Sequence, residues 1–456
     1  MDENNNITQS GGAYFAQDFY IKSLKLLLSN GVQVDLHKIL LEMSYYEDIY
    51  SFVTSGHITV VDSQGFHEIF QLDGNQYIEM SFSKTPNGVN GINKTFRVYS
   101  SSGRNPTGNL NTEAYTLFFC SEELILSEQN KIGKSFKGKK ITEIITYIVK
   151  DKLKVSTNKI KKIEDTTGIY DFIIPKMKPF EAISWLSNYA RPVSKNTMSA
   201  DMLFFETKEG FNFRSLASMF EEKVYAEYKY EAENVLDNTK IQRKTLNVLQ
   251  YEISKPYDIL NEINSGTFAN RLISIDPLTR TTIVTDFNFG KYKEKSTKLN
   301  LNAPENTLKN RLNKTEEESP EGSLKLAFGN SNQQNVPYIK QQGNVAKDIF
   351  IESFVPNRTA QISLANYTTI KVVIPGDPGI TAGRTIQFSL MSLQPSLNKK
   401  ELDKYYSGKY LVTAARHIIA MGGAYQTVLE LSKESSKSVH NAIKVNSPIW
   451  KEVVKK

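Results

Sequence analysis

The chain has 456 residues, and its 56 Lys and Arg against 49 Asp and Glu give a formal net charge of +7. One hydrophobic core rarely spans such a length, so we expect roughly two to four domains. The mild basic excess suits an acidic partner without demanding nucleic acid. A single cysteine excludes an internal disulfide, and no apolar run approaches the roughly 20 residues of a membrane-spanning helix.

The chain starts with a polar segment, MDENNNITQSGG. It has neither the basic segment nor the apolar segment of a secretory signal. We expect residues 1–12 to form a disordered leader. The protein is then expected to stay in a cytoplasm-like space, or to be built into a particle there.

Residues 13–129 are predicted to form a first β domain. Short runs rich in Val, Ile, Phe, Tyr and Thr alternate with turn signals, which is typical of a barrel or sandwich. The segment HEIFQLDGNQYIEMSFS predicts a hairpin whose turn holds Asp73 and Gly74. The predicted strands are Ile21–Leu28, Ile58–Val61, His67–Leu72, Tyr77–Phe82, Lys94–Tyr99 and Ala114–Cys120.

Residues 130–225 change character and are predicted to form an α+β insert. Apolar residues recur at helical spacing in Lys140–Val149 and in Lys178–Ala190, where Pro179 suits a first helical turn. A short apolar strand, Ile169–Ile174, is expected to stop at Pro175. A hairpin is predicted from Asp201–Glu206 and Gly210–Arg214.

Residues 226–345 are predicted to form a second insert with a long polar loop. Arg271–Ile275 and Thr281–Asp286 are its expected strands. Tyr292–Val345 is rich in Lys, Glu, Asn, Gln and Ser and lacks a sustained period. This composition indicates a loop or a partly disordered excursion.

Residues 346–432 return to β character, and residues 433–456 form a polar tail. A helix is predicted over Val355–Tyr367, and a long hairpin over Gly408–Ile419 and Ala424–Leu431. Two further strands are expected at Thr369–Ile374 and Thr385–Leu390. The predicted class is α+β and β-dominated, with two related antiparallel β domains and inserted α+β domains.

The sequence displays no catalytic, cofactor or metal site. None of the five histidines belongs to an HExxH motif. His57 with His67 and Glu68 could meet across a hairpin as metal ligands, but cysteine and paired histidine ligands are missing, so ordinary polar strand residues are the better interpretation. Cys120 lies in an apolar run, which predicts a buried and unreactive thiol.

Three charged segments are candidates for a function. Gly133-Lys134-Ser135 lacks the first glycine and the preceding strand of a phosphate loop. Glu316-Glu317-Glu318 is interpreted as a solvated charge run. The lysine-rich stretch Lys131–Lys162 favours a solvated helix face, with a docking face for an acidic protein and a nucleic-acid groove as alternatives.

Four segments resemble the baseplate central hub family of contractile-tailed bacteriophages. ITEIITYIVKDKL and YDFIIPKMKPFEAISWLSNYARP are similar to that family's insert, in which a helix, an extended stretch and a second helix follow one another. PGDPGITAGRTIQFSL and SGKYLVTAARHIIAMGGAYQTVLELS are similar to the family's last tube strands. The resemblance covers most of residues 20–432.

The resemblance implies two tube-like antiparallel β-barrel domains per chain and a homotrimer with pseudo-six-fold symmetry. Such a ring joins the six-fold tail tube to the three-fold spike. The implied partners are the tail spike protein, the tail tube protein and other baseplate proteins, with DNA passing through the channel. The location implied is the virion, after assembly in the host cytoplasm, and neither enzymatic activity nor a small-molecule substrate nor a cofactor is expected. The alternatives are a tail-associated cell-wall hydrolase and a lysine-rich nucleic-acid-binding protein.

Overall fold

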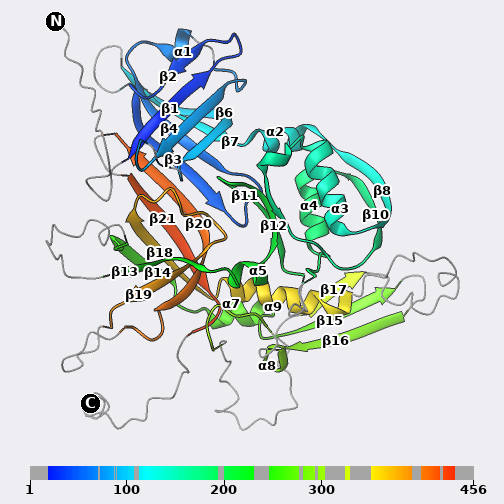
Figure 1. Cartoon of the computed structure of the whole chain (residues 1–456). Helices are drawn as coiled ribbons and strands as arrows, with labels where there is room; N and C mark the ends of the chain where they lie inside the picture. The colour runs from blue at the N-terminus through cyan, green and yellow to red at the C-terminus, as the bar shows by residue number, and fades with distance from the viewer. Residues whose placement is uncertain are drawn as a thin grey trace, which may run out of the picture.

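A computed structural model of the chain describes residues 19–69, 72–86, 88, 90–106, 112–193, 200–230, 246–276, 281–292, 296–302, 324–328, 351–392, 402–421 and 425–436. Strands predominate, and most helices lie in the middle of the chain (Figure 1). The β-dominated α+β class is therefore confirmed. The predicted leader and residues 437–456 of the predicted tail lie outside the described residues. Among the described residues, no helix is both long enough and apolar enough to cross a membrane.

The first β region is a run of antiparallel strands around its own hydrophobic core. Along β4, Ile58 and Val60 are fully buried, while the residues between them are partly exposed. This alternation arises because successive side chains of a strand point to opposite faces. The elements are β1 (Tyr20–Leu27), β2 (Gln33–Asp35), β3 (Leu40–Asp48), β4 (Ser55–Asp62), α1 (Phe66–Ile69), β5 (Tyr77–Ser83), β6 (Ile92–Pro106) and β7 (Glu113–Cys120).

The second β region has a separate core and combines strands from two parts of the chain. Ile370, Phe388 and Leu429 are among its fully buried residues. The parallel pair of β13 with β19 and the antiparallel pair of β14 with β18 bring the middle of the chain into this region. Its strands are β13 (Val224–Tyr230), β14 (Gln250–Lys255), β18 (Thr368–Pro375), β19 (Thr385–Leu390), β20 (Gly408–Ala420) and β21 (Tyr425–Lys433).

Among the strands that the structure describes, a single pair joins the two β regions into one 13-stranded sheet. β3 pairs with β20 in antiparallel register, from Asp48 opposite Ala414 to Glu42 opposite Ala420. In Figure 1 the blue strands therefore continue into the orange ones. The main path of the sheet runs from β14 to β2 and does not close among the described residues, so the predicted pair of closed barrels is not confirmed.

The insert stands beside this sheet and packs its helices on short strands (Figure 1). Its core joins Ile144 and Ile145 of α3, Ile183 of α4 and Phe213 of β12. The two predicted helices and the predicted hairpin are confirmed. The elements are α2 (Glu122–Gln129), β8 (Ile132–Lys139), α3 (Ile141–Tyr147), the π-helical turn η1 (Ile148–Lys152), η2 (Thr157–Lys159), β9 (Ile160–Ile163), β10 (Tyr170–Met177), α4 (Pro179–Ser187), β11 (Met202–Thr207), β12 (Gly210–Ser215) and α5 (Leu216–Phe220).

A hairpin arm projects from the lower part of the molecule in Figure 1. Its predicted strands pair along their whole length, from Ala269 opposite Asn288 to Asp276 opposite Thr281. Phe268, Phe287 and the helix residue Leu364 form a small core at its base. The elements are α7 (Ile259–Asn264), β15 (Ala269–Asp276), β16 (Thr281–Asn288), α8 (Phe289–Tyr292), β17 (Leu324–Phe328), η6 (Ile351–Ser353) and α9 (Val355–Ala365).

The predicted strand His67–Leu72, and with it the hairpin around Asp73 and Gly74, is wrong. Residues 66–69 form the helical turn α1. Both edges of β5 are already occupied, by β1 and β6, so no further strand can pair with it there. Asp73 instead accepts hydrogen bonds from the backbone of Asn75 and the side-chain amide of Gln76, which stabilises a local turn.

Two further expectations about strands are corrected. Pro175 does not end its strand, because β10 continues to Met177; a register shift between Ile174 and Met177 accommodates the residue without a ladder hydrogen bond. The polar excursion Tyr292–Val345 contains a strand, β17, which pairs in parallel with β15. Most of that excursion lies outside the described residues.

At Gly56 the central strands approach one another too closely to leave room for a side chain. A Cβ atom there would lie 2.2 Å from the backbone oxygen of Ser44 and 2.4 Å from the ring of Phe119. We expect Gly56→Ala to lower the free energy of unfolding by about 1–3 kcal/mol, because the neighbouring strand must shift. Urea denaturation measures this change. Gly133→Ala is the control, since its Cβ would lie 3.9 Å from the nearest atom; equal losses in both variants would contradict the prediction.

Candidate functional site

Two buried carboxylates lie where the first β region, the insert and the second β region meet. Glu47 of β3 is 1% exposed and Glu206 of β11 is 4% exposed. Charged residues are almost never buried to this degree unless they are paired. With Lys94 and Lys208 they form what we call the carboxylate junction.

Glu47 connects all three parts of the fold through hydrogen bonds to its two carboxylate oxygens. One oxygen accepts from the backbone N–H of Lys208 at 2.6 Å, in the β11–β12 turn of the insert. The other accepts from the backbone N–H of Ala382 at 3.0 Å, in the loop between β18 and β19. The hydroxyl of Tyr45 donates at 3.0 Å from the same strand. One side chain therefore fixes the insert and the second β region to the first.

Glu206 forms the corresponding contact from the insert. It accepts hydrogen bonds from the ammonium of Lys94 at 2.6 Å, from the backbone and hydroxyl of Thr54 at 2.9 and 3.0 Å, and from Ser121 at 2.5 Å. Lys94 also donates to the carbonyl of Thr207 at 2.8 Å. The pair is nearly dry, so its charges are poorly screened.

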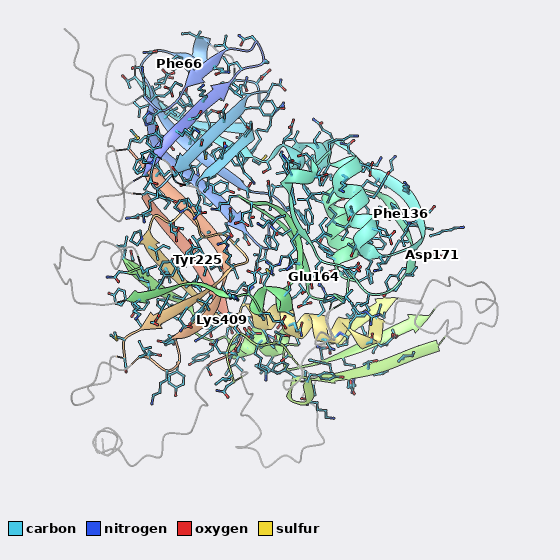
Figure 2. All side chains as sticks on the ribbon, viewed as in Figure 1. Phe66, Phe136, Glu164, Asp171, Tyr225 and Lys409 are labelled. Atoms are coloured by element: carbon cyan, nitrogen blue, oxygen red, sulfur yellow. The ribbon has the colours of Figure 1, made fainter. Side chains whose placement is uncertain are left out.

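Two lysines extend the same connection through backbone carbonyls. Lys208 donates to the carbonyl of Asn90 at 3.0 Å and to that of Pro378, one in each β region. Lys409 of β20 donates to the carbonyls of Phe220 and Glu222 at 2.5 and 2.7 Å, at the end of α5. Lys409 lies at the contact of the second sheet with α5 in Figure 2.

Burial shifts the pKa values of two groups in the junction, Glu47 and Lys208. Burial raises the pKa of the Glu47 carboxyl, while the N–H groups of Ala382 and Lys208 and the charge of Lys94 act against this rise. Burial also lowers the pKa of Lys208, against the attraction of Glu47. Because each charge depends on its neighbours, removing one partner leaves another uncompensated in the interior.

His417 of β20 lies fully buried beside the junction. Its Nδ1 atom is 2.8 Å from the Tyr425 hydroxyl and 3.3 Å from that of Thr427. Burial, with a smaller contribution from the charge of Lys208, lowers its pKa to about 3. His417 is therefore neutral at pH 7 and acts as a hydrogen-bonding core residue.

Of the metal-ligand candidates of the sequence, the structure describes the side chain of His57 alone. The His57 side chain lies on β4, where its ring contacts the Tyr46 hydroxyl at 3.2 Å and Glu42 at 3.9 Å. The side chains of His67 and Glu68 lie outside the described residues. No group of three or more potential metal ligands occurs in the part of the chain that the structure describes. Cys120 is buried in β7 as predicted, and burial raises the pKa of its thiol to about 12.

The charged segments of the sequence take different places. Gly133-Lys134-Ser135 lies within strand β8 and forms no loop; Lys134 stacks its ammonium 4.0 Å from the centre of the Tyr147 ring. The stretch Lys131–Lys162 runs through strands, helices and turns from β8 to β9, so it is more than the solvated helix face that we expected. Phe136 and Asp171 mark the outer side of this part in Figure 2. Glu316–Glu318 lies outside the described residues.

The carboxylate junction was not found from the sequence, although a local signal was present. Met202, Phe204 and Glu206 alternate on one face of β11, and Met43, Tyr45 and Glu47 do the same on β3. A carboxylate at a position where alternation calls for an apolar residue indicates a buried charge with a partner. The partner itself comes from a distant segment, so the pattern does not identify it.

Comparison with known proteins rests on structure. No family model and no curated protein match the sequence. The tail protein from Neisseria meningitidis MC58 is similar in fold, with a TM-score of 0.53 at 10% identity over 91% of this chain and 97% of that chain. The 43 kDa tail protein of prophage MuSo2 from Shewanella oneidensis has a TM-score of 0.52 at 9% identity, over 90% and 98%. This chain has the fold of a tail protein. The resemblance inferred from the sequence segments is confirmed at the level of the fold.

Removal of one junction carboxylate should strongly destabilise this tail-protein fold. Glu206→Ala leaves the Lys94 ammonium, which is 15% exposed, without its partner. We expect the free energy of unfolding to fall by about 3–5 kcal/mol in urea denaturation. Glu143→Ala, which breaks the exposed pair with Lys139, should cost less than about 1 kcal/mol. Similar losses for the two variants would show that the junction is not special.

The low pKa of His417 predicts a specific loss of stability in mild acid. The unfolded chain binds a proton near pH 6.5, whereas folded His417 does so only near pH 3. The contribution is therefore complete above pH 6.5 and is lost as the pH falls. Between pH 7 and pH 5 the wild type should lose about 2 kcal/mol more than His417→Gln, which keeps a hydrogen-bonding side chain but cannot titrate. Parallel pH dependences of the two proteins would refute this assignment.

Proposed function

We propose that the chain is a structural component of a phage-type tail baseplate and serves as its central hub, located in the virion. The observation that carries this proposal is the fold, which matches two tail proteins over about nine-tenths of this chain. A structural role also suits the use of charge in the interior. The best-connected ionisable groups, Glu47 and Glu206, fix segments of the chain to one another and are closed off from solvent.

The finer proposal is that the hub is a homotrimer with pseudo-six-fold symmetry. Residues 13–129 and 346–432 would each act as a tube-like β domain, so three chains present six such domains. This ring would join the six-fold tail tube to the three-fold spike and contact other baseplate proteins, with DNA passing through its channel. The two separate β cores, connected by one sheet, support this arrangement.

The open ends of the sheet support assembly through strand edges. β14 and β2 each pair with one neighbouring strand among the described residues. Exposed strand edges promote pairing with another chain, and a closed ring removes them. Leu246 and Leu249, just before β14, are 40% and 43% exposed, and a bridge between Asn247 and Lys229 of β13 covers the backbone there. We propose that a neighbouring subunit covers the edge of β14 itself, together with these two side chains.

Light scattering of the full chain, alone and with its spike protein, tests the trimer. The expected mass is three times the 51.7 kDa of one chain for the protein alone, or three chains plus the bound spike for the complex. Leu249→Asp should reduce trimer formation, because it introduces a charge beside the β14 edge. Ile173→Asp is the matched control on the insert, where Ile173 is 73% exposed. A strict monomer in both conditions would overturn the proposed trimer.

A further inference from the structure

A cavity of about 440 Å³ lies between part of the insert and the second β region. One wall is a face of the three-stranded sheet β11–β12–β9, on which Phe205, Asn212 and Lys162 are cross-strand neighbours. The other wall comprises the start of β13 with Tyr225 and the loop that leads into β19. Figure 2 shows Tyr225 on the side of the second sheet and Glu164, directly after β9, on the side of the insert.

The two faces of this small sheet differ in character. Phe204, Phe211 and Phe213 point to the face that packs on the insert helices. Asn212 and Arg214, which alternate with them along β12, face the cavity. Polar residues on an inward-facing sheet surface are retained where that surface meets a polar partner. The cavity is therefore a polar gap and not an extension of either core.

The lining of the cavity carries an excess of positive charge. Glu209 pairs with Lys161 at 2.9 Å and with Arg384 at 2.6 Å, and Glu222 pairs with Arg214 at 2.8 Å. These two carboxylates face five cationic side chains. The five are Lys161, Lys162, Arg214, Lys223 and Arg384.

Three of the cationic groups keep unused capacity to bind an anion. Lys162 and Lys223 are exposed and make no ion pair within 4 Å among the described residues. Arg214 is 6% exposed, and its Nε atom has no hydrogen-bond partner in the described part of the chain. A buried donor without a partner is uncommon in folded proteins. An anion bound in the cavity would balance the positive charge around the Arg214 side chain.

We propose that this cavity binds an acidic peptide segment of a partner protein. Carboxylate side chains match the lysine and arginine donors, and the walls at Phe205 and Val224 suit their methylene groups. A nucleic acid fits less well, because Arg384 covers the Tyr225 ring at 5.1 Å and occupies the surface on which a base would stack. The proposal goes beyond the hub role and does not depend on trimer formation.

Calorimetric titration of the full chain with acetylated hexaglutamate at low ionic strength tests the proposal. The wild type should bind the peptide, and raising the salt concentration should weaken binding. The double variant Lys162→Glu with Lys223→Glu should bind at least about tenfold more weakly, because it reverses the two free charges of the cavity. Unchanged thermal unfolding of this variant would show that its fold is intact.

A matched double variant separates the cavity from general surface charge. Lys137→Glu with Lys150→Glu makes the same change of charge at exposed positions outside the cavity lining. This control should keep its affinity for hexaglutamate within about twofold. The proposal is overturned if the wild type does not bind, or if the control loses as much affinity as the cavity variant. It is also overturned if oligothymidylate binds the cavity more tightly than the peptide and is lost in the same variant.

Discussion

The Glu47 carboxylate holds the two β regions and the insert in one arrangement. Its oxygens accept backbone N–H groups from the β11–β12 turn and from the β18–β19 loop, while its own strand pairs with β20. Hydrogen bonds to a charged group are stronger than those between neutral groups. Losing one in the interior leaves the buried charge without compensation. The arrangement is therefore specific: a small rotation of the insert would break several such bonds together. The buried charge therefore makes the relative placement of the three parts stiff.

Much of the local structure follows from the sequence, because it depends on neighbouring residues. The pattern of apolar residues predicts strands at β4 and β18. Apolar residues at helical spacing, together with Pro179, predict α4. The long final hairpin is also evident, since β20 and β21 are adjacent in the chain. In each case one face of the element is buried against a core, so apolar residues recur in the sequence at the spacing of that face.

The remaining features depend on contacts between distant segments. β3 was not predicted, because its buried residues include Ser44 and Glu47, whose partners lie far away in the sequence. The run at His67 has a suitable composition for a strand, yet no strand edge is free to pair with it. The joining of two β regions into one sheet is not visible in any local pattern either. The texture of the segments did indicate the tail-protein fold, because it reflects the order of elements.

The pairing of β3 with β20 has a consequence for synthesis. β3 ends at Asp48 and its partner strand begins at Gly408, so most of the chain separates them. During translation the N-terminal strands emerge early and bury one another, while one edge of β3 stays open until β20 has left the ribosome. Contacts so distant in sequence form slowly, and an open central edge attracts strands of other nascent chains. Productive folding then depends on how long the edge of β3 stays unpaired. A long unpaired period favours chaperone binding to the growing N-terminal half.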